Sequence, residues 1–245
     1  TSPQPTLLRL CWPNSASDTG FDPRKNGRMN LHRRKSLRQV LRGGVAAQVL
    51  HWAGWTSLMM PSAMAGNQAE EALSDAVRTA LSQALLQSGP PVPVLPTAQD
   101  RQQFDAWRNA TSRTLSKWMD VAEDRQEFLN TLWYEARRAG LSLSLVLGLI
   151  EVESAFRKYA ISSAGARGYM QVMPFWVHSI GDGNESALFQ TQTQLRYGCI
   201  ILRHMMEREN GNLFFALGRY NGSRGQAAYP QAVLAAQKKW LQPVD

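Results

Sequence analysis

The sequence predicts an all-α fold, or one nearly so, for the region 98–245. Apolar residues recur there at intervals of three and four, which is the spacing of a helix with one buried face. No segment alternates apolar and polar residues over enough length to predict a strand. The region holds about 150 residues, enough to bury a core of packed helices.

Seven segments carry the helical spacing. The first, 69–88, has Leu81 and Leu85 on one face and is followed by Gly89, a common helix end. The stretch PPVPVLP (90–96) holds four prolines in seven residues and predicts an extended linker within the segment 66–97. Whether the first helix packs on the rest or recruits a partner stays open. The other helices are expected at 98–118, 121–138, 142–156, 191–208, 212–218 and 226–240.

The net charge of +8 lies almost wholly in residues 1–65, which hold +7 of it. The remainder of the chain, 66–245, carries only +1. It therefore lacks the positive field with which a protein binds DNA or RNA, and we expect no nucleic-acid partner.

Residues 29–65 have the layout of a secretory signal peptide. A basic cluster, HRRKSLRQVLR, precedes a moderately apolar run, VAAQVLHWAGWTSLMM, and then PSAMA followed by glycine. This order predicts cleavage near Ala65–Gly66 and a periplasmic protein with no stable membrane anchor. Residues 1–28 are expected to be an upstream or disordered segment.

The route of export stays open. The pair Arg33–Arg34 resembles a twin-arginine signal, so general secretory and twin-arginine export are both possible routes. The alternative of a membrane-anchoring helix is disfavoured, because the apolar run contains Gln48 and His51 and is short for a span.

The cysteines and histidines indicate no metal or cofactor. Cys11 and Cys199 are too few for a disulfide framework, and none of the four histidines has the spacing of a metal ligand. Cys199 lies in the apolar run GCIIL, where burial is expected.

Glu153 projects from the apolar face of the helix expected at 142–156. Counting back three, four and seven positions from it gives Ile150, Leu149 and Val146. A carboxyl group removed from water has a raised pKa, and a protonated carboxyl near neutral pH can act as a general acid. The alternative is a structural glutamate paired with Arg157 or Arg167. The helix by itself leaves both interpretations open.

Three blocks of sequence resemble the soluble lytic murein transglycosylases, whose catalytic domain is similar to goose-type lysozyme. They are EVESAF (151–156), GARGYMQVMP (165–174) and GRYNGSRG (218–225), in the order of the family. The resemblance covers roughly 120–240 and implies a lysozyme-like catalytic domain over 98–245, preceded by the short helix and the proline-rich linker.

The resemblance implies roles for individual residues. Glu153 would be the catalytic acid and base, with Tyr220 and Asn221 facing it across the cleft. The substrate-binding residues would be Ser154, Met170, Gln171, Tyr220 and Asn221. Each has a structural alternative: a methionine can fill the core, a tyrosine hydroxyl can bond a backbone carbonyl, and Asn-Gly can be a turn. Tyr169, Arg219 and Gly222–Ser223 depart from the family pattern, which bears on substrate preference.

The reaction implied by the resemblance cleaves the β-1,4 bond between N-acetylmuramic acid and N-acetylglucosamine in peptidoglycan and leaves a 1,6-anhydro sugar. A hydrolase normally needs a second carboxylate, and none is evident. Glu151 lies on another face of its helix, and Asp182 and Glu185 fall in GDGNES, expected to be a surface turn. We therefore expect a monomeric lytic transglycosylase acting on glycan strands. A hydrolytic lysozyme and a non-catalytic wall-binding protein are the alternatives.

Overall fold

The computed structural model describes residues 68, 70, 72–86 and 92–243. The chain divides into two units, Thr1–Trp55 and Thr56–Asp245, and every described residue lies in the second. The expected upstream segment, the signal peptide with its cleavage site, and Cys11 lie outside the described residues. None of the described helices is both long and apolar enough to cross a membrane.

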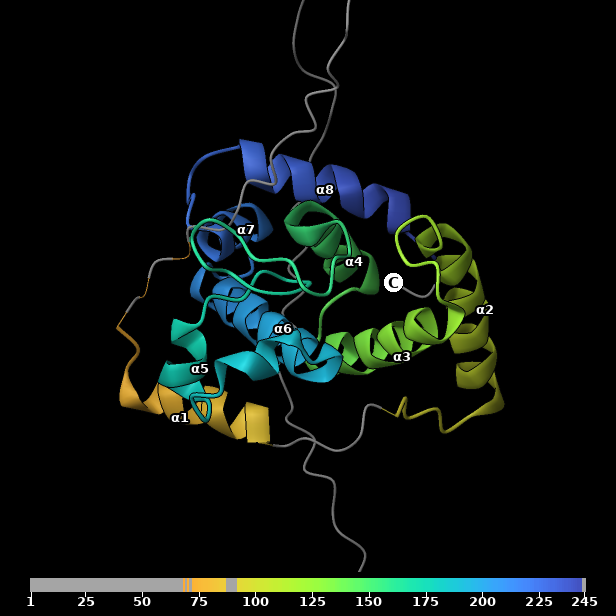
Figure 1. Ribbon diagram of the computed structural model, residues 1–245, viewed down its shortest axis with the longest axis horizontal. Coiled ribbons are helices and arrows are strands. Elements are labelled where there is room, and N and C mark those ends of the chain that lie inside the picture. The colour runs from red at the N-terminus through yellow and green to blue at the C-terminus, as the bar shows by residue number, and fades with distance from the viewer. Residues whose placement is uncertain (1–67, 69, 71, 87–91, 244–245) are drawn as a thin grey trace, which may run out of the picture. The chain divides into compact units, whose positions relative to one another are not determined.

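The described part of the chain is helical, which confirms the predicted fold class (Figure 1). Beyond the helices it contains two isolated bridges, Ile161↔Arg167 and Arg167↔Val172, and no named strand. The elements are α1 (Asp75–Leu86), α2 (Ala98–Leu115), α3 (Ala122–Arg138), α4 (Leu143–Ser154), α5 (Phe175–Ile180), the 3₁₀ helix η1 (Glu185–Phe189), α6 (Thr191–Arg208), α7 (Leu213–Asn221) and α8 (Ala228–Trp240).

Helix α4 is the most deeply buried element, lying below α8 and beside α3 in Figure 1. Its side chains are apolar almost all round, as expected of a core helix. The Ser142 side chain caps its start by accepting a hydrogen bond from the Leu145 backbone N–H at 3.1 Å. Gly148 lets α8 approach closely, because a Cβ there would lie 2.6 Å from the backbone nitrogen of Gln237.

Helix α1 packs on the main body of the domain, against α5 and α6. Its Leu81 and Leu85 are buried, and the Ser82 hydroxyl donates to the Ile180 carbonyl at 2.8 Å. Arg138 of α3 donates to the Ala84 carbonyl at 2.7 Å. The proline-rich segment therefore connects two parts of one packed unit, which answers the question that the sequence left open.

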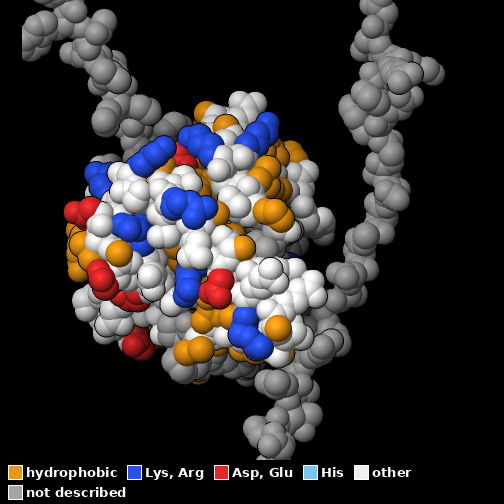
Figure 2. Space-filling view, turned by 90° about the vertical axis from the view of Figure 1, so that its right-hand side faces the viewer, with side chains coloured by type: hydrophobic (Ala, Val, Ile, Leu, Met, Phe, Trp, Pro, Cys, Tyr) orange, Lys and Arg blue, Asp and Glu red, His pale blue; other side chains and the backbone are white. Residues whose placement is uncertain are grey.

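Helix α2 begins directly after that segment. Thr97 caps its first turn in a reciprocal capping box, in which Thr97 Oγ1 accepts from the Asp100 backbone N–H and the Asp100 carboxylate accepts from the Thr97 N–H, both at 3.0 Å. On this side of the molecule, basic and acidic side chains are interspersed with apolar ones (Figure 2).

Two short helices were not predicted. Helix α5 has six residues and η1 has five, too few for an apolar period to be recognised. The polar run GDGNES leads into η1, which is anchored by the fully buried Leu188. The predicted helix 142–156 also ends two residues early, because Ala155 and Phe156 adopt left-handed conformations with φ of 48° and 59°.

Candidate active site

Glu153 lies in the last turn of α4 and is only 2% exposed, as its position on the apolar face predicted. One carboxyl oxygen, Oε1, accepts a hydrogen bond from the Tyr229 hydroxyl at 2.5 Å. The other, Oε2, is buried and has no hydrogen-bond partner among the described residues. The carboxyl group therefore has one hydrogen-bonded oxygen and one oxygen without a partner among the described residues.

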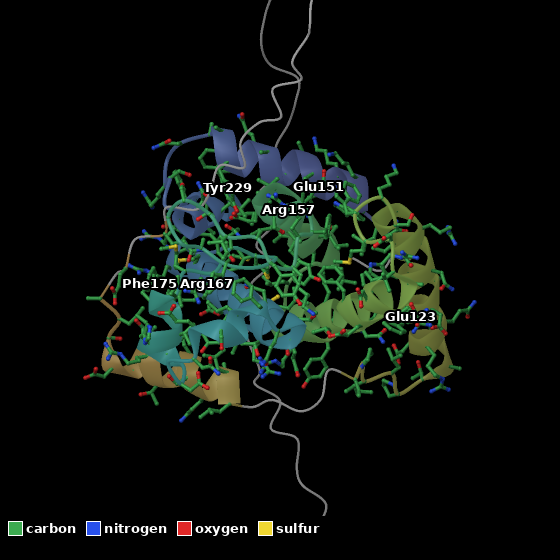
Figure 3. All side chains as sticks on the ribbon, viewed as in Figure 1. Glu123, Glu151, Arg157, Arg167, Phe175 and Tyr229 are labelled. Carbon is green, nitrogen blue, oxygen red and sulfur yellow. The ribbon has the colours of Figure 1, made fainter. Side chains whose placement is uncertain are left out.

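No arginine pairs with Glu153 in the part of the chain that the structure describes. Arg157 uses its Nε to donate to the Ser154 carbonyl at 2.9 Å. Arg167 pairs with Glu185 at 2.5 Å. Both arginines are labelled in Figure 3. The structural alternative considered for Glu153 is therefore wrong for both candidate partners.

Burial raises the pKa of Glu153 from its ordinary value of 4.5 to about 8, and the hydrogen bond from Tyr229 only partly opposes this shift. A carboxyl group with that pKa is mostly protonated at neutral pH. The pKa values of Tyr229 and Tyr220 lie well above their ordinary value, chiefly because both side chains are buried and next because Glu153 is near. Both phenols therefore stay protonated.

Ser154 connects α4 to the loop at 162–174. Its side chain is buried and donates to the Tyr169 carbonyl at 2.8 Å, with a second contact to the Ile150 carbonyl at 3.2 Å. The hydroxyl predicted to contact substrate is thus used inside the protein.

Met170 and Gln171 lie in the same loop and are also buried. Met170 is fully buried and packs against Gly198 of α6. Gln171, at φ 50°, donates from its side-chain amide to the Gly168 carbonyl at 3.0 Å and to the Ala160 carbonyl at 3.2 Å. The amide holds the loop in its tight turn.

Tyr220 lies close to Glu153 but bonds a different group. Its hydroxyl donates to the Met170 carbonyl at 2.8 Å, and the ring is fully buried. This is the backbone contact that the sequence analysis weighed as the structural alternative. Asn221 donates from Nδ2 to Ser223 Oγ at 3.0 Å, while its Oδ1 is buried without a partner among the described residues.

The tyrosine that contacts Glu153 is Tyr229, which sequence reasoning did not select (labelled in Figure 3). It lies in the first turn of α8 and is 2% exposed. The signal that could have found it is the buried stripe of that helix, because Tyr229, Val233 and Trp240 follow one another at helical spacing. The stripe places the ring in the core but does not identify the partner of its hydroxyl.

The other nearby acidic residues are engaged elsewhere. Glu151 accepts from Lys239 Nζ at 2.6 Å and from Trp240 Nε1 at 2.7 Å. Glu185 contacts Arg167 and also His178 Nε2 at 2.9 Å, so it is held by partners and is not simply part of a free turn. Within the described residues no group of three or more His, Cys, Asp or Glu side chains could hold a metal ion.

Arg219, one of the departures from the family pattern, helps to hold the segment 218–225. Arg219 Nε lies 2.6 Å and Arg224 Nε 2.8 Å from the Glu209 carboxylate, which is 8% exposed. Contact with both guanidinium groups lowers the pKa of Glu209 to about 2. This cluster fixes the chain on either side of Tyr220.

Parts of the chain are similar to known proteins. Residues 132–242 match the family described as Transglycosylase SLT domain. Proteins named membrane-bound lytic murein transglycosylase C are similar over short stretches. The protein from Glaesserella parasuis is 56% identical over 39 residues, 16% of this chain and 11% of the relative. The one from Haemophilus ducreyi is 41% identical over 68 residues, 27% of this chain and 18% of the relative.

The aligned region spans less than a fifth of these curated relatives. The X-ray structure of an inactive mutant of lytic transglycosylase Slt from Pseudomonas aeruginosa is 18% identical, with a TM-score of 0.42, over 72% of this chain and 38% of that chain. Over residues 132–242, the chain is similar to the family described as Transglycosylase SLT domain.

Proposed function

We propose that this protein is a peptidoglycan lytic transglycosylase that cleaves the β-1,4 bond between N-acetylmuramic acid and N-acetylglucosamine. The observation that carries the proposal is the buried Glu153 carboxyl, with a pKa raised to about 8 and a single hydrogen bond from Tyr229. The match of residues 132–242 to the Transglycosylase SLT domain supports the choice of substrate.

In the first step, Glu153 acts as a general acid. It donates its proton to the glycosidic oxygen while the bond from that oxygen to C1 of the muramic sugar breaks. The hydrogen bond from Tyr229 to Oε1 then stabilises the negative charge that develops on the carboxylate. Because Oε2 has no partner among the described residues, the proton to be transferred is assigned to that oxygen.

In the second step, the same carboxylate acts as a base. It takes the proton from the C6 hydroxyl of the muramic sugar as that oxygen attacks C1, which closes the 1,6-anhydro ring and restores the protonated acid. The chain supplies no external nucleophile in this scheme. Glu151 is occupied by Lys239 and Trp240, which favours this route over hydrolysis with two carboxylates.

The remaining residues divide into two roles in this proposal. Gln171 and Asn221 contact the glycan through their side-chain oxygens, because Gln171 Nε2 already donates to the Ala160 and Gly168 carbonyls and Asn221 Oδ1 has no partner among the described residues. Ser154, Met170 and Tyr220 bind substrate only through the loop that they hold in place, since their polar atoms or side chains are used inside the protein. Because Glu153 is 2% exposed, a glycan reaches it only after neighbouring side chains move apart.

The test compares the wild-type chain with Glu153→Gln on purified peptidoglycan sacculi. We expect the variant to fold and to bind the wall without turnover. Glu151→Gln is the matched control, two positions away on the same helix, and should retain turnover. Activity of Glu153→Gln comparable to that of the wild type would remove Glu153 from the mechanism.

The masses of the products separate the transglycosylase from a lysozyme. Anhydro ends are lighter than reducing ends by one water, about 18 mass units. We expect anhydro ends from the wild type. Reducing ends would identify a hydrolase on the same fold, and a complete lack of cleavage would identify a wall-binding protein.

Export to the periplasm and action as a monomer without a membrane anchor belong to the same proposal. The basic cluster, apolar run and small-residue site in 29–65 support export. N-terminal sequencing of the protein recovered from a periplasmic extract should give a chain beginning at Gly66. Recovery only from the membrane fraction would contradict the absence of an anchor.

A further inference from the structure

The described residues that precede α1 lie against the domain. Gln68 is 8% exposed, and its Oε1 accepts a hydrogen bond from Trp176 Nε1 of α5 at 3.0 Å. Leu73 is partly buried against the hydrophobic core. The Ser179 hydroxyl of α5 donates to Glu70 Oε1 at 3.5 Å. We call the three residues Gln68, Glu70 and Leu73 the strap.

The strap lies where the two later family blocks approach each other. Gln68 and Leu73 line a pocket of about 130 Å³. Its wall also includes Trp176, which closely follows the block GARGYMQVMP, and Gly222 and Arg224, which belong to the block GRYNGSRG. These blocks contain the two side chains that the proposed function assigns to the glycan.

The space that the strap leaves open is too small for a sugar. A cavity of about 150 Å³ holds one benzene molecule, and a hexose is larger than benzene. The 130 Å³ beside Gln68 and Leu73 therefore cannot accept a sugar ring while both side chains stay in place. A glycan that extends along this edge of the site has to displace them.

The strap also reaches the tyrosine beside Glu153. Burial is the main cause of the raised pKa of Tyr220, the charge of Glu153 is the next, and the Gln68 side chain opposes the shift. The Gln68 amide therefore lies close to the Tyr220 phenol. Glu153 itself is 2% exposed. The strap thus belongs to the surroundings that keep Glu153 away from water.

The contacts of the strap are few enough to be broken reversibly. Gln68 Nε2 is buried without a hydrogen-bond partner among the described residues, and a buried donor without a partner costs free energy. Glu70 is exposed, and its contact with Ser179 is long for a hydrogen bond. Helix α1 is held more firmly, because Leu81 and Leu85 are buried in the core. The strap can therefore leave its site while α1 stays docked.

We propose that the strap is autoinhibitory and occupies one edge of the glycan site until a glycan strand displaces it. The inference rests on the proposed function. Because α1 holds the strap beside the pocket, the strap competes with the glycan at a high effective concentration. The acetamido carbonyls and hydroxyls of a glycan can accept the hydrogen bond that Trp176 Nε1 donates to Gln68. The apparent affinity for the glycan is then lowered by the fraction of molecules whose strap is docked.

The test measures binding of a glycan by the full chain. Gln68→Ala is introduced into the Glu153→Gln chain and titrated with a fluorescent, soluble glycan fragment made from peptidoglycan. We expect it to bind this fragment roughly fivefold more tightly than the Glu153→Gln parent, because the strap is loosened. Leu73→Ala should change the affinity in the same direction and replaces Gln68→Ala if that variant does not fold, as judged by thermal unfolding.

Gln103→Ala is the matched control. It is the same substitution at an exposed glutamine of α2, in a different surface groove, and should leave the affinity unchanged. An affinity of Gln68→Ala equal to that of the parent would overturn the inference. Weaker binding would also overturn it, since Gln68 would then be part of the glycan site and not its competitor. No binding by parent or variant would overturn it too.

Turnover provides a second measurement. In the chain that retains Glu153, Gln68→Ala should lower KM for soluble peptidoglycan by roughly the same factor and leave kcat unchanged, because only the docked fraction changes. A general loss of stability does not lower KM. A KM equal to that of the wild type would contradict the autoinhibition.

Failure of the proposed function gives a different result. If the wild-type chain leaves sacculi uncut, the function is wrong, and the affinities of the chains carrying Glu153→Gln still decide the role of the strap. If the wild type releases anhydro products and Gln68→Ala binds the glycan like its parent, only the present inference fails.

Discussion

Replacing Glu153 with glutamine should stabilise the protein, and the gain should grow as the pH rises. In the folded protein the carboxyl keeps its proton up to a pH of about 8, whereas in the unfolded chain it loses the proton above about 4.5. Between these values the folded state binds more protons, so raising the pH favours unfolding of the wild type. Glutamine has no such proton to lose.

The size of the expected stability difference follows from the shift in the pKa of Glu153. Each pH unit between the two pKa values lowers the free energy of unfolding by about 1.36 kcal/mol, which amounts to roughly 3 kcal/mol by pH 7. This stability is fully present below pH 4.5 and is lost as the pH approaches 8. All other titrating groups are common to both proteins, so they cancel when the two are compared.

The assay is urea unfolding of wild type and Glu153→Gln from pH 4 to pH 8. The difference in free energy of unfolding should increase in favour of the variant across this range. Glu151→Gln is the control, and it should instead destabilise the protein because it removes the ion pair with Lys239. A difference that is flat with pH would mean that the folded carboxyl is ionised and would refute the reasoning.

Three further predictions test the surroundings of the site. Tyr229→Phe removes the hydrogen bond that stabilises the Glu153 carboxylate, so the pKa of that carboxyl should rise by about one unit and turnover should fall roughly tenfold. The pKa is read from ¹³C chemical shifts and the turnover from product release, both as a function of pH. An unchanged pKa would contradict the assignment. Gly148→Ala should cost about 1–3 kcal/mol of unfolding free energy in urea titrations, because the new methyl group meets the Gln237 backbone; a neutral effect would show that α8 can shift. Glu209→Gln should lower the free energy of unfolding by about 1–3 kcal/mol at pH 7, and by less as the pH falls from 4.5 toward 2. The reason is that the Glu209 carboxylate of the wild type takes up a proton over this range and loses its ion pairs. Calorimetry that shows the same destabilisation at pH 4.5 and at pH 2 would be inconsistent with this prediction.

The long helices could be predicted because each shows several turns of one apolar period. The helix Thr191–Arg208 lies where the sequence predicts one at about 191–208, since its apolar positions repeat from end to end. Helix α5 has less than two turns and so shows no period. The early end of α4 depends on two non-glycine residues with positive φ, a conformation that composition does not reveal.

The candidate site was predictable in part for the same reason. The burial of Glu153 follows from one helix, because its neighbours on the same face are three residues of that helix. Its hydrogen bond to Tyr229 joins residues 76 positions apart, and which of two buried tyrosines makes it depends on how α7 and α8 are placed on α4. Tyr220, the residue favoured by the resemblance, lies close to Glu153 but is bonded to Met170.

The docking of α1 has a practical consequence for anyone trimming this chain for crystallisation. The family match starts at residue 132, and the proline-rich stretch at 90–96 would be a natural place to truncate the chain. Such a truncation would remove Leu81 and Leu85 and expose the apolar surface of α5 and α6 that they cover. Two truncated molecules would associate through this exposed surface. A shortened recombinant protein should therefore retain α1, although α1 contains no recognisable sequence motif.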